Sequence, residues 1–349
     1  MLSIGKLGQG QEAYYIETVA KGAEEYYLGH GEAPGRWVGT SAGRLGLADQ
    51  VDGDELRALL RHLDPRTDEL LTRGRSTPKV AGFDLTFCAP KSVSLLWAFG
   101  SSEVAAAAVA AHEAAVDAAL ALMQTEAARV RRGKAGCDIL DAEGFVAAAF
   151  RHRTSRAGDP HLHTHVVVGN IGYLDTDGRW SALDARHIFR WAQPVGYVYE
   201  AHLRYELSKR LDAGWGLVRN GIADLAGVPR AAIDQFSTRR REIIEHLEAR
   251  GVAGGRAAQV ATYATRRAKA AVEEVDLRAQ WTLEALDAGL QPVALGTVAT
   301  VTAEPVDVVE LFADLGGSHG ITERRSSFDR RCCHRPARAK LSRPVCRRS

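Results

Sequence analysis

Three histidines close together are the residues in this sequence best suited to chemistry. His152 is followed by His163 and His165 in the stretch RHRTSRAGDPHLHTHVVVGN. The last two are separated by one residue at the start of a β-branched run typical of a strand, where side chains at i and i+2 point to the same face. His163 and His165 are therefore expected to bind one metal ion, with His152 supplied by a neighbouring element. Neutral imidazole is a common ligand of transition metals.

A site with three protein ligands leaves coordination positions open, as catalytic metal sites do. A metal of this kind polarises a carbonyl or phosphoryl oxygen, or activates water. The alternative interpretation is a strand end that is rich in histidine, with His161 on the same face, but burying such a cluster without a metal is costly. We expect one divalent ion, and three histidines do not decide between Mg²⁺, Mn²⁺ and Zn²⁺.

The N-terminal region contains a candidate nucleophile. Residues 12–27 read EAYYIETVAKGAEEYY, with tyrosine pairs at Tyr14–Tyr15 and Tyr26–Tyr27. A tyrosine that attacks phosphorus becomes covalently bound to the substrate, and the step is reversible because the aryl phosphodiester keeps the energy of the broken bond. The alternative is an amphipathic helix whose aromatic face packs in the core. The nearby metal site favours the catalytic interpretation.

The segment VAGFDLTFCAPKSVSLLWAFG, residues 80–100, contributes two further candidates. Apolar and polar residues alternate over 80–88, which predicts a half-buried strand. Asp84 would accept a hydrogen bond from a ligand histidine or take the tyrosine proton, and the alternative is an acid that faces solvent. Lys91 follows at the predicted start of a helix, a position suited to binding phosphate.

These motifs together resemble a known family. The tyrosine pairs, FDLTF-x-APKSVS and the H-x10-HxH pattern in DP-x-LHTHVVV-x-N resemble the relaxase domain of conjugative plasmids, of the TrwC/TraI (MobF) family of HUH endonucleases. The resemblance covers residues 1 to about 330, with the motifs in the family order. It implies an enzyme that nicks one DNA strand at the origin of transfer and stays attached to the 5′ end through a phosphotyrosine.

The resemblance also implies a role for each matching residue. Tyr14 matches the nucleophile of the first cut, and Tyr26 matches a second tyrosine used in the terminating transfer. The pairs are twelve residues apart here, wider than in those relatives. The metal ligands match His152, His163 and His165, and the acid that orients a ligand histidine and assists deprotonation matches Asp84.

Further properties follow from the same resemblance. The expected partners are single-stranded or hairpin origin-of-transfer DNA and the accessory and coupling proteins of the relaxosome, with the chain acting as a cytoplasmic monomer that does not insert into a membrane. Two rival interpretations stay open. The first is a hydrolytic nuclease that uses the same three histidines with a metal-bound water, and the second is a truncated, inactive remnant that binds DNA.

The expected fold is α/β, a two-layer palm with a central antiparallel sheet flanked by helices, plus a C-terminal helical fingers segment. Residues 1–230 would form the palm with the catalytic site, 231–290 the fingers, 291–329 the lead-in to a missing helicase part, and 330–349 a basic aberrant tail. Beside an N-terminal strand and a tyrosine-bearing helix, strands are predicted at 80–88, 144–151 and 163–171, and helices at 52–63, 91–99, 103–128 and 194–213.

Composition agrees with a protein of a reducing compartment. The five cysteines show no paired framework, and MLSIGKLGQGQEAYY lacks the apolar core of a secretory signal. The alanine-rich stretch 103–128 is the most apolar window, but its interspersed acids indicate a long soluble helix. The tail RRCCHRPARAKLSRPVCRRS is read as the product of a shifted or truncated reading frame, with a basic nucleic-acid arm as the alternative.

Net charge gives little support for DNA binding. Without the last twenty residues the chain has 37 basic against 43 acidic residues, so DNA contact must depend on local patches. The candidate DNA contacts are Lys91, Arg151, Arg153 and Arg156, and a solvated surface is the alternative. The three arginines flank a predicted metal ligand. Trp37, Trp180 and Trp191 would stack on bases or, as the favoured interpretation, belong to the core.

Overall fold

The structure is a computed structural model, and it describes residues 1–8, 35–72, 79–133, 136–155, 157–250 and 274–300, together with Val309 and Ala313. The predicted sites Tyr14, Tyr26 and Arg156 lie outside the described residues, as does the basic tail.

A five-stranded sheet forms the centre of the fold, in the order β1-β3-β7-β6-β2. The strands are β1 (Leu2–Gly8), β2 (Arg36–Val38), β3 (Val80–Cys88), β6 (Ala147–Thr154) and β7 (Pro160–Gly169), and each neighbouring pair is antiparallel. The predicted α/β fold with a central antiparallel sheet is confirmed. The strand with the HxH motif, β7, is the middle strand, so its side chains are flanked by neighbours on both sides.

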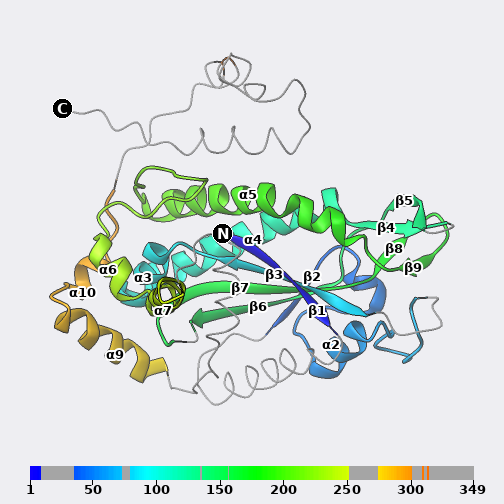
Figure 1. The fold of residues 1–349 in the computed structure, drawn as a ribbon, viewed down its shortest axis with the longest axis horizontal. Helices are drawn as coiled ribbons and strands as arrows, with labels where there is room; N and C mark the ends of the chain where they lie inside the picture. The colour runs from blue at the N-terminus through cyan, green and yellow to red at the C-terminus, as the bar shows by residue number, and fades with distance from the viewer. Residues whose placement is uncertain are drawn as a thin grey trace.

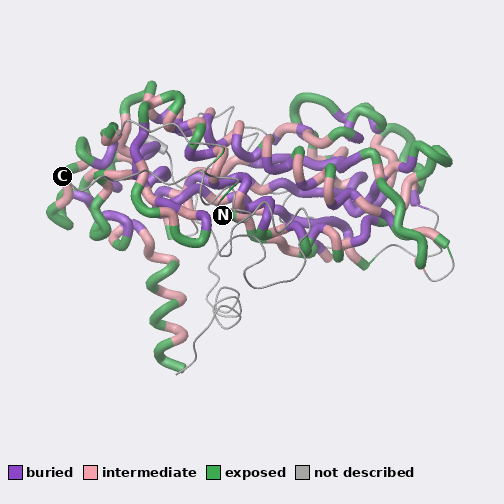
Figure 2. The backbone as a smooth tube through the Cα atoms, turned by 90° about the horizontal axis from the view of Figure 1, so that it is seen from above, coloured by how far each residue is buried: buried purple, intermediate pink, exposed green. Residues whose placement is uncertain are grey.

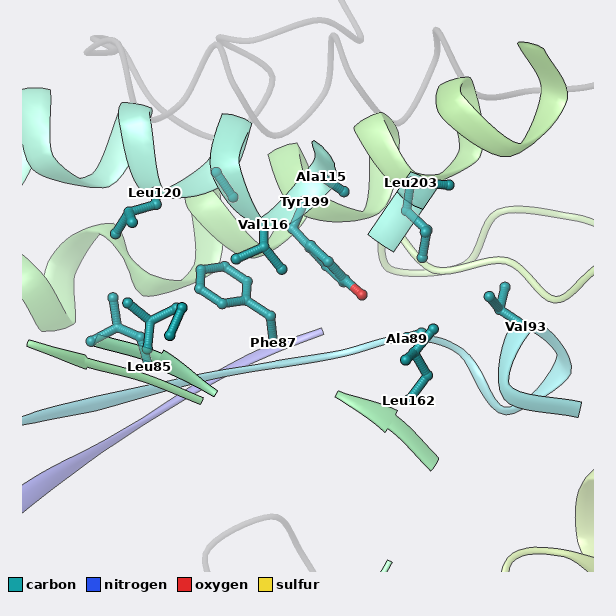
Figure 3. Close-up of a cluster of buried hydrophobic side chains, with 14 of the residues drawn as sticks. Leu85, Phe87, Ala89, Val93, Ala115, Val116, Leu120, Leu162, Tyr199 and Leu203 are labelled. Carbon is teal, nitrogen blue, oxygen red and sulfur yellow. The ribbon is translucent and has the colours of Figure 1, made fainter. Parts of the chain in front are cut away.

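Two long helices cover one face of this sheet, α4 (Ser102–Ala127) and α5 (Ala185–Leu211) (Figure 1). Figure 3 shows Leu85 and Phe87 of β3 pointing toward Val116 of α4 and Tyr199 of α5. The buried stripe of α4 consists mostly of alanine at helical spacing, which lets the helix lie close to its neighbours. Among the described helices, α4 alone is long and apolar enough to cross a membrane, and the core helix of a soluble protein passes the same test.

The opposite face of the sheet is covered at one end by α2 (Gly53–Leu60). Leu59 of this helix lies against Gly169 of β7, and Leu60 lies against Gly82 of β3. Asp52 begins α2 by accepting hydrogen bonds from two backbone amides of its first turn. The histidines are at the other end of β7, so α2 does not cover their part of the sheet.

Smaller elements lie at the two ends of the sheet (Figure 1). One end holds the hairpins β4 (Arg129–Arg132)–β5 (Asp138–Asp141) and β8 (Gly172–Leu174)–β9 (Arg179–Ser181), and η1 (Ala42–Leu45) packs in the core beneath α2. The other end holds α3 (Lys91–Phe99), α6 (Arg230–Gln235), α7 (Thr238–Glu248), α9 (Glu274–Asp287) and α10 (Pro292–Leu295). Figure 2 shows α7 projecting from the body, in agreement with its lack of buried residues.

Several element boundaries differ from the predictions. The helix predicted at 194–213 begins at Ala185, because Asp184 caps it and Pro194 lies inside the helix rather than at its start. The strand predicted at 144–151 is β6, which continues to Thr154 and therefore carries His152 itself. Strand β2 is not among the predicted strands, and it is recognised only by its pairing with β6. Trp37 and Trp191 are buried, as the core interpretation predicts.

Candidate metal centre

Strand register brings the three predicted histidine ligands together. In the antiparallel pairing of β6 with β7, His152 lies directly opposite His163, and His165 is two residues further along β7 on the same face. One ring nitrogen from each residue lies within 4.8 Å of those of the other two. The cluster is half-buried, with His163 only 8% exposed. The described chain therefore assembles three nitrogen donors around one point.

Hydrogen bonds orient two of the rings. His165 Nδ1 lies 2.9 Å from both carboxylate oxygens of Asp84, and His163 Nδ1 lies 2.8 Å from the backbone oxygen of His161. A carboxylate or carbonyl oxygen only accepts, so Nδ1 donates in both rings, and in the neutral imidazole the lone pair is then on Nε2. Orientation of a ligand imidazole through its second nitrogen is typical of metal sites. The donor set and its tautomers fit a divalent metal.

Asp84 is the acid that the sequence singled out, and it is nearly buried. It lies on the same face of β3 as Thr86, whose hydroxyl is 3.2 Å from the Asp84 carboxylate and 3.1 Å from His165 Nδ1. Thr86 in turn lies opposite His165 in the β3–β7 register. The carboxylate, the hydroxyl and the imidazole therefore form one connected group, and the alternative of a solvent-facing acid does not match this geometry.

Two further groups border the site. The His161 ring stacks on the His163 ring with centroids 4.6 Å apart, and burial lowers the pKa of His161 well below its usual value, so it stays neutral. Burial also raises the pKa of the Cys88 thiol to about 11. Neither residue belongs to the described group of metal-ligating side chains.

The predicted DNA contacts do not all lie on the histidine face. Arg151 alternates with His152 along β6, and its guanidinium pairs with Glu113 of α4 on the helix-covered face. The guanidinium of Arg153 lies 5.8 Å from the ring centre of Trp97. Lys91 donates from Nζ to the backbone oxygen of Pro160 at 2.6 Å, and burial lowers its pKa to about 8. DNA binding by these residues stays a prediction.

Sequence reasoning missed a buried polar group behind the HxH motif. Thr164, between the two β7 histidines, points to the opposite face, where its hydroxyl lies 2.8 Å from His112 Nε2. The other nitrogen of His112 lies 2.8 Å from the Tyr199 hydroxyl. Burial lowers the pKa of His112 well below its usual value and raises that of Tyr199. The available signal was a lone histidine on the alanine stripe of α4.

Comparison with known proteins gives the same family that the sequence motifs resemble. The TrwC relaxase family model matches residues 8–288. The multifunctional conjugation protein TraI of Escherichia coli is 30% identical over 268 residues, which covers 74% of this chain and 15% of that protein. TraI of E. coli strain K12 is 28% identical over 293 residues, covering 80% of this chain and 16% of that protein. The chain thus spans about a sixth of the length of these relatives.

Solved structures extend the match to three dimensions. A copper-bound structure of conjugative relaxase TrwC with OriT DNA has a TM-score of 0.73 and 34% identity, and the match covers 84% of this chain and 100% of that one. TrwC with a 27-mer DNA comprising the recognition hairpin and the cleavage site has a TM-score of 0.71 and 32% identity, with the same coverage. This chain belongs to the TrwC relaxase family.

Proposed function

We propose that this chain is a conjugative relaxase that nicks one strand of plasmid origin-of-transfer DNA and forms a 5′-phosphotyrosyl adduct. The observation that carries the proposal is the convergence of His152, His163 and His165, with two rings oriented to present Nε2 to one ion. The family membership supports it, because similar structures are named as metal-bound or copper-bound TrwC with OriT DNA.

The proposed reaction is a transesterification with Tyr14 as the nucleophile. The Tyr14 Oη–P bond forms as the bond from phosphorus to the 3′ oxygen breaks, and the released 3′ oxygen takes a proton. Asp84, which accepts a hydrogen bond from His165 Nδ1, would keep that ring oriented and would assist deprotonation of the phenol. A bound divalent ion, Mg²⁺, Mn²⁺ or Zn²⁺, would stabilise negative charge on the non-bridging phosphate oxygens. Tyr26 would act in the terminating transfer.

The remaining parts of the proposal concern partners and organisation. We propose single-stranded or hairpin origin-of-transfer DNA as the substrate, relaxosome accessory and coupling proteins as partners, and action as a monomer in the cytoplasm. Residues 1–230 would be the palm, 231–290 the fingers, 291–329 the lead-in to a helicase part, and 330–349 the aberrant tail. The extruded or single-stranded form of the DNA is required because a duplex would hold the phosphate away from the site.

A covalent-adduct assay tests the function. The full chain is mixed with Mn²⁺ and single-stranded fragments tiled across the DNA beside its gene, and products are separated under denaturing conditions. We expect a protein–DNA band that is lost in Tyr14→Phe and kept in Tyr15→Phe, the matched control within the same pair. Tyr26→Phe should keep the first cut and lose strand transfer to a second DNA.

The two rival functions give different results in the same assay. Cleavage without an adduct, at an equal rate in the wild type and in Tyr14→Phe, would assign a hydrolytic nuclease with structural tyrosines. Bound metal with neither adduct nor cleavage on any fragment would assign an inactive DNA-binding remnant.

A further inference from the structure

The turn between β6 and β7 separates the ligand His152 from the ligand His163, and it is held from outside the sheet. Asp159 Oδ2 accepts a hydrogen bond of 3.0 Å from the backbone amide of Thr238, at the first residue of α7. The indole nitrogen of Trp281, in the middle of α9, donates to the backbone oxygen of Gly158 at 2.9 Å. Two segments more than seventy residues away in sequence therefore bind consecutive residues of one turn.

The side chains that make both contacts are buried, so the contacts constrain the turn more than those of surface side chains would. Trp281 is 2% exposed and Asp159 is 6% exposed. Asp159 also accepts from the Ser155 hydroxyl across the turn at 3.3 Å. A third hydrogen bond from outside the turn runs from Lys91 Nζ to the backbone oxygen of Pro160. A buried polar group that loses its partner costs about 1–3 kcal/mol, so these bonds are expected to stay made.

Helix α9 is itself firmly docked at this end of the molecule (Figure 1). The ring of Trp281 meets the ring of Trp97 of α3 edge-on, with centroids 5.9 Å apart. Arg278, one turn earlier on α9, lies 5.3 Å from the same Trp97 ring and donates to its backbone oxygen. Ala285 of α9 is fully buried in the main core. The donor at Trp281 is therefore fixed in position relative to the sheet.

The geometry of the turn bears directly on the metal centre. The β6–β7 register pairs His152 with His163, then shifts before Thr154 pairs with Pro160. The irregularity lies directly after this ligand pair, so the regular ladder ends at His152 and the contacts of the turn hold the chain beyond it. Metal–ligand distances tolerate changes of only about 0.2 Å. A turn that relaxes by more than this would weaken the site without unfolding the sheet.

We propose that Trp281 and Asp159 are positioning residues for the metal centre, and that the docking of α9 is thermodynamically coupled to metal binding through this turn. The inference rests on the three-histidine site of the proposed function, and it does not depend on DNA nicking. Coupling is reciprocal, so bound metal stabilises the docking of α9 by the same factor that docked α9 strengthens metal binding.

The first test uses Trp281→Phe, which keeps an aromatic ring in the core and removes the N–H donor. We expect Co²⁺ and Mn²⁺ to bind the full chain about 10–100-fold more weakly, as for residues that orient metal ligands, and the Co²⁺ absorption bands to change. The control is Trp37→Phe, which removes another indole donor, bonded to Glu55 at 3.0 Å, next to α2. Equal metal affinity in the two variants would overturn the proposal.

A second pair of variants separates positioning from folding. Asp159→Asn keeps an acceptor oxygen for the Thr238 amide, whereas Asp159→Ala removes it. We expect Asn to keep most of the metal affinity and Ala to lose it, with both variants folded by circular dichroism. Hydrogen exchange of the α9 amides should slow on addition of Co²⁺ in the wild type and not in Trp281→Phe. If the hydrogen-exchange rate of the α9 amides in the wild type is the same with and without Co²⁺, the coupling is contradicted.

The proposed function and this inference fail in different ways. A wild-type chain that binds no divalent metal would remove the three-histidine site itself. A wild-type chain that binds metal, with Trp281→Phe binding equally well, would overturn this inference and leave the proposed function intact.

Discussion

The two faces of the central sheet are built from the same strands, yet around the histidines their side chains differ in polarity and burial. On the face covered by α4 and α5, β3 and β7 present Leu85, Phe87, Val166 and Val168, each at most 1% exposed. On the other face the alternate residues include Asp84, Thr86, His163 and His165, which hydrogen-bond to one another or to the backbone. Successive residues of a strand point to opposite faces, so a shift of one residue would exchange the polar side chains of the site with the apolar side chains of the core.

The comparison of the two faces shows how the histidines are held in place by packing on the other side of the sheet. The histidines are half-buried, but the strands that carry them are fixed by an apolar layer on their reverse side. On the helix side of β7 the Thr164 hydroxyl hydrogen-bonds to His112, while its neighbours His163 and His165 belong to the metal centre. Substitutions on one face should therefore change folding stability, and substitutions on the other should change metal affinity.

The largest effect is expected from Phe87→Ala on the helix-covered face. Phe87 is fully buried against Tyr199, and its removal leaves a cavity, so the free energy of unfolding should fall by about 3–5 kcal/mol. Chemical denaturation of the metal-free protein measures the loss. Metal affinity of the folded fraction should stay close to that of the wild type, and a large drop in affinity would show that the faces are not independent.

His163→Ala should have the opposite pattern. Loss of one of three ligands should weaken divalent metal binding by at least about 100-fold, more than the loss of a group that only orients a ligand. The free energy of unfolding of the metal-free chain should change by less than about 1 kcal/mol, since the side chain is at the edge of the core. Calorimetric titration with Mn²⁺ and denaturation with a chelator give the two quantities. An unchanged affinity would exclude His163 as a ligand.

Asp84→Asn tests the hydrogen bond that orients His165. An amide oxygen still accepts from Nδ1, but the negative charge is lost, so metal affinity should fall by about 10–100-fold. Thr86→Val is the companion variant, because it removes the hydroxyl beside the same carboxylate and should have a smaller effect. If both variants bind metal as the wild type does, the Asp84 contact has no part in ligand orientation.

The smallest effect is a pH dependence at Lys91, which donates a hydrogen bond to the backbone oxygen of Pro160 after the β6–β7 turn. Burial lowers its pKa from 10.5 to about 8, so the folded protein pays a desolvation cost that is full below pH 8 and disappears as pH rises toward 10.5. Between pH 8 and 9.5 the wild type should gain up to about 2 kcal/mol of stability relative to Lys91→Met. Denaturation of both chains with a chelator present measures this difference, and a constant difference would show that Lys91 is not desolvated.

Local patterns in the sequence predicted much of the fold and the site. The alternation of apolar and polar residues over 80–88 predicted β3 and the face of Asp84, and the HxH spacing predicted that His163 and His165 share a face. These features depend on neighbours along the chain, so periodicity is enough to find them. Of the three tryptophans predicted to belong to the core, Trp37 and Trp191 are buried and Trp180 is partly buried against it.

The features that the sequence did not reveal depend on contacts between distant segments. Strand β2 is three residues long, and only its pairing with β6 distinguishes it from a loop. The start of α5 was predicted at residue 194 because proline is common in the first turn of a helix. In the structure Pro194 is buried inside the helix, which begins at Ala185. The bond from Trp281 to Gly158 spans 123 residues, and no local pattern indicates it.

The most direct test of the account measures metal binding and adduct formation on the same sample. The full chain is titrated with Mn²⁺ while bound metal and the protein–DNA adduct are both quantified, in the wild type, in His163→Ala and in Phe87→Ala under conditions where it is folded. We predict one metal per chain in the wild type, with the amount of adduct rising in step with the amount of bound metal. In His163→Ala both curves should move to higher Mn²⁺ concentration, and in Phe87→Ala neither should move. An adduct that forms equally well in His163→Ala, or without metal, would contradict the account.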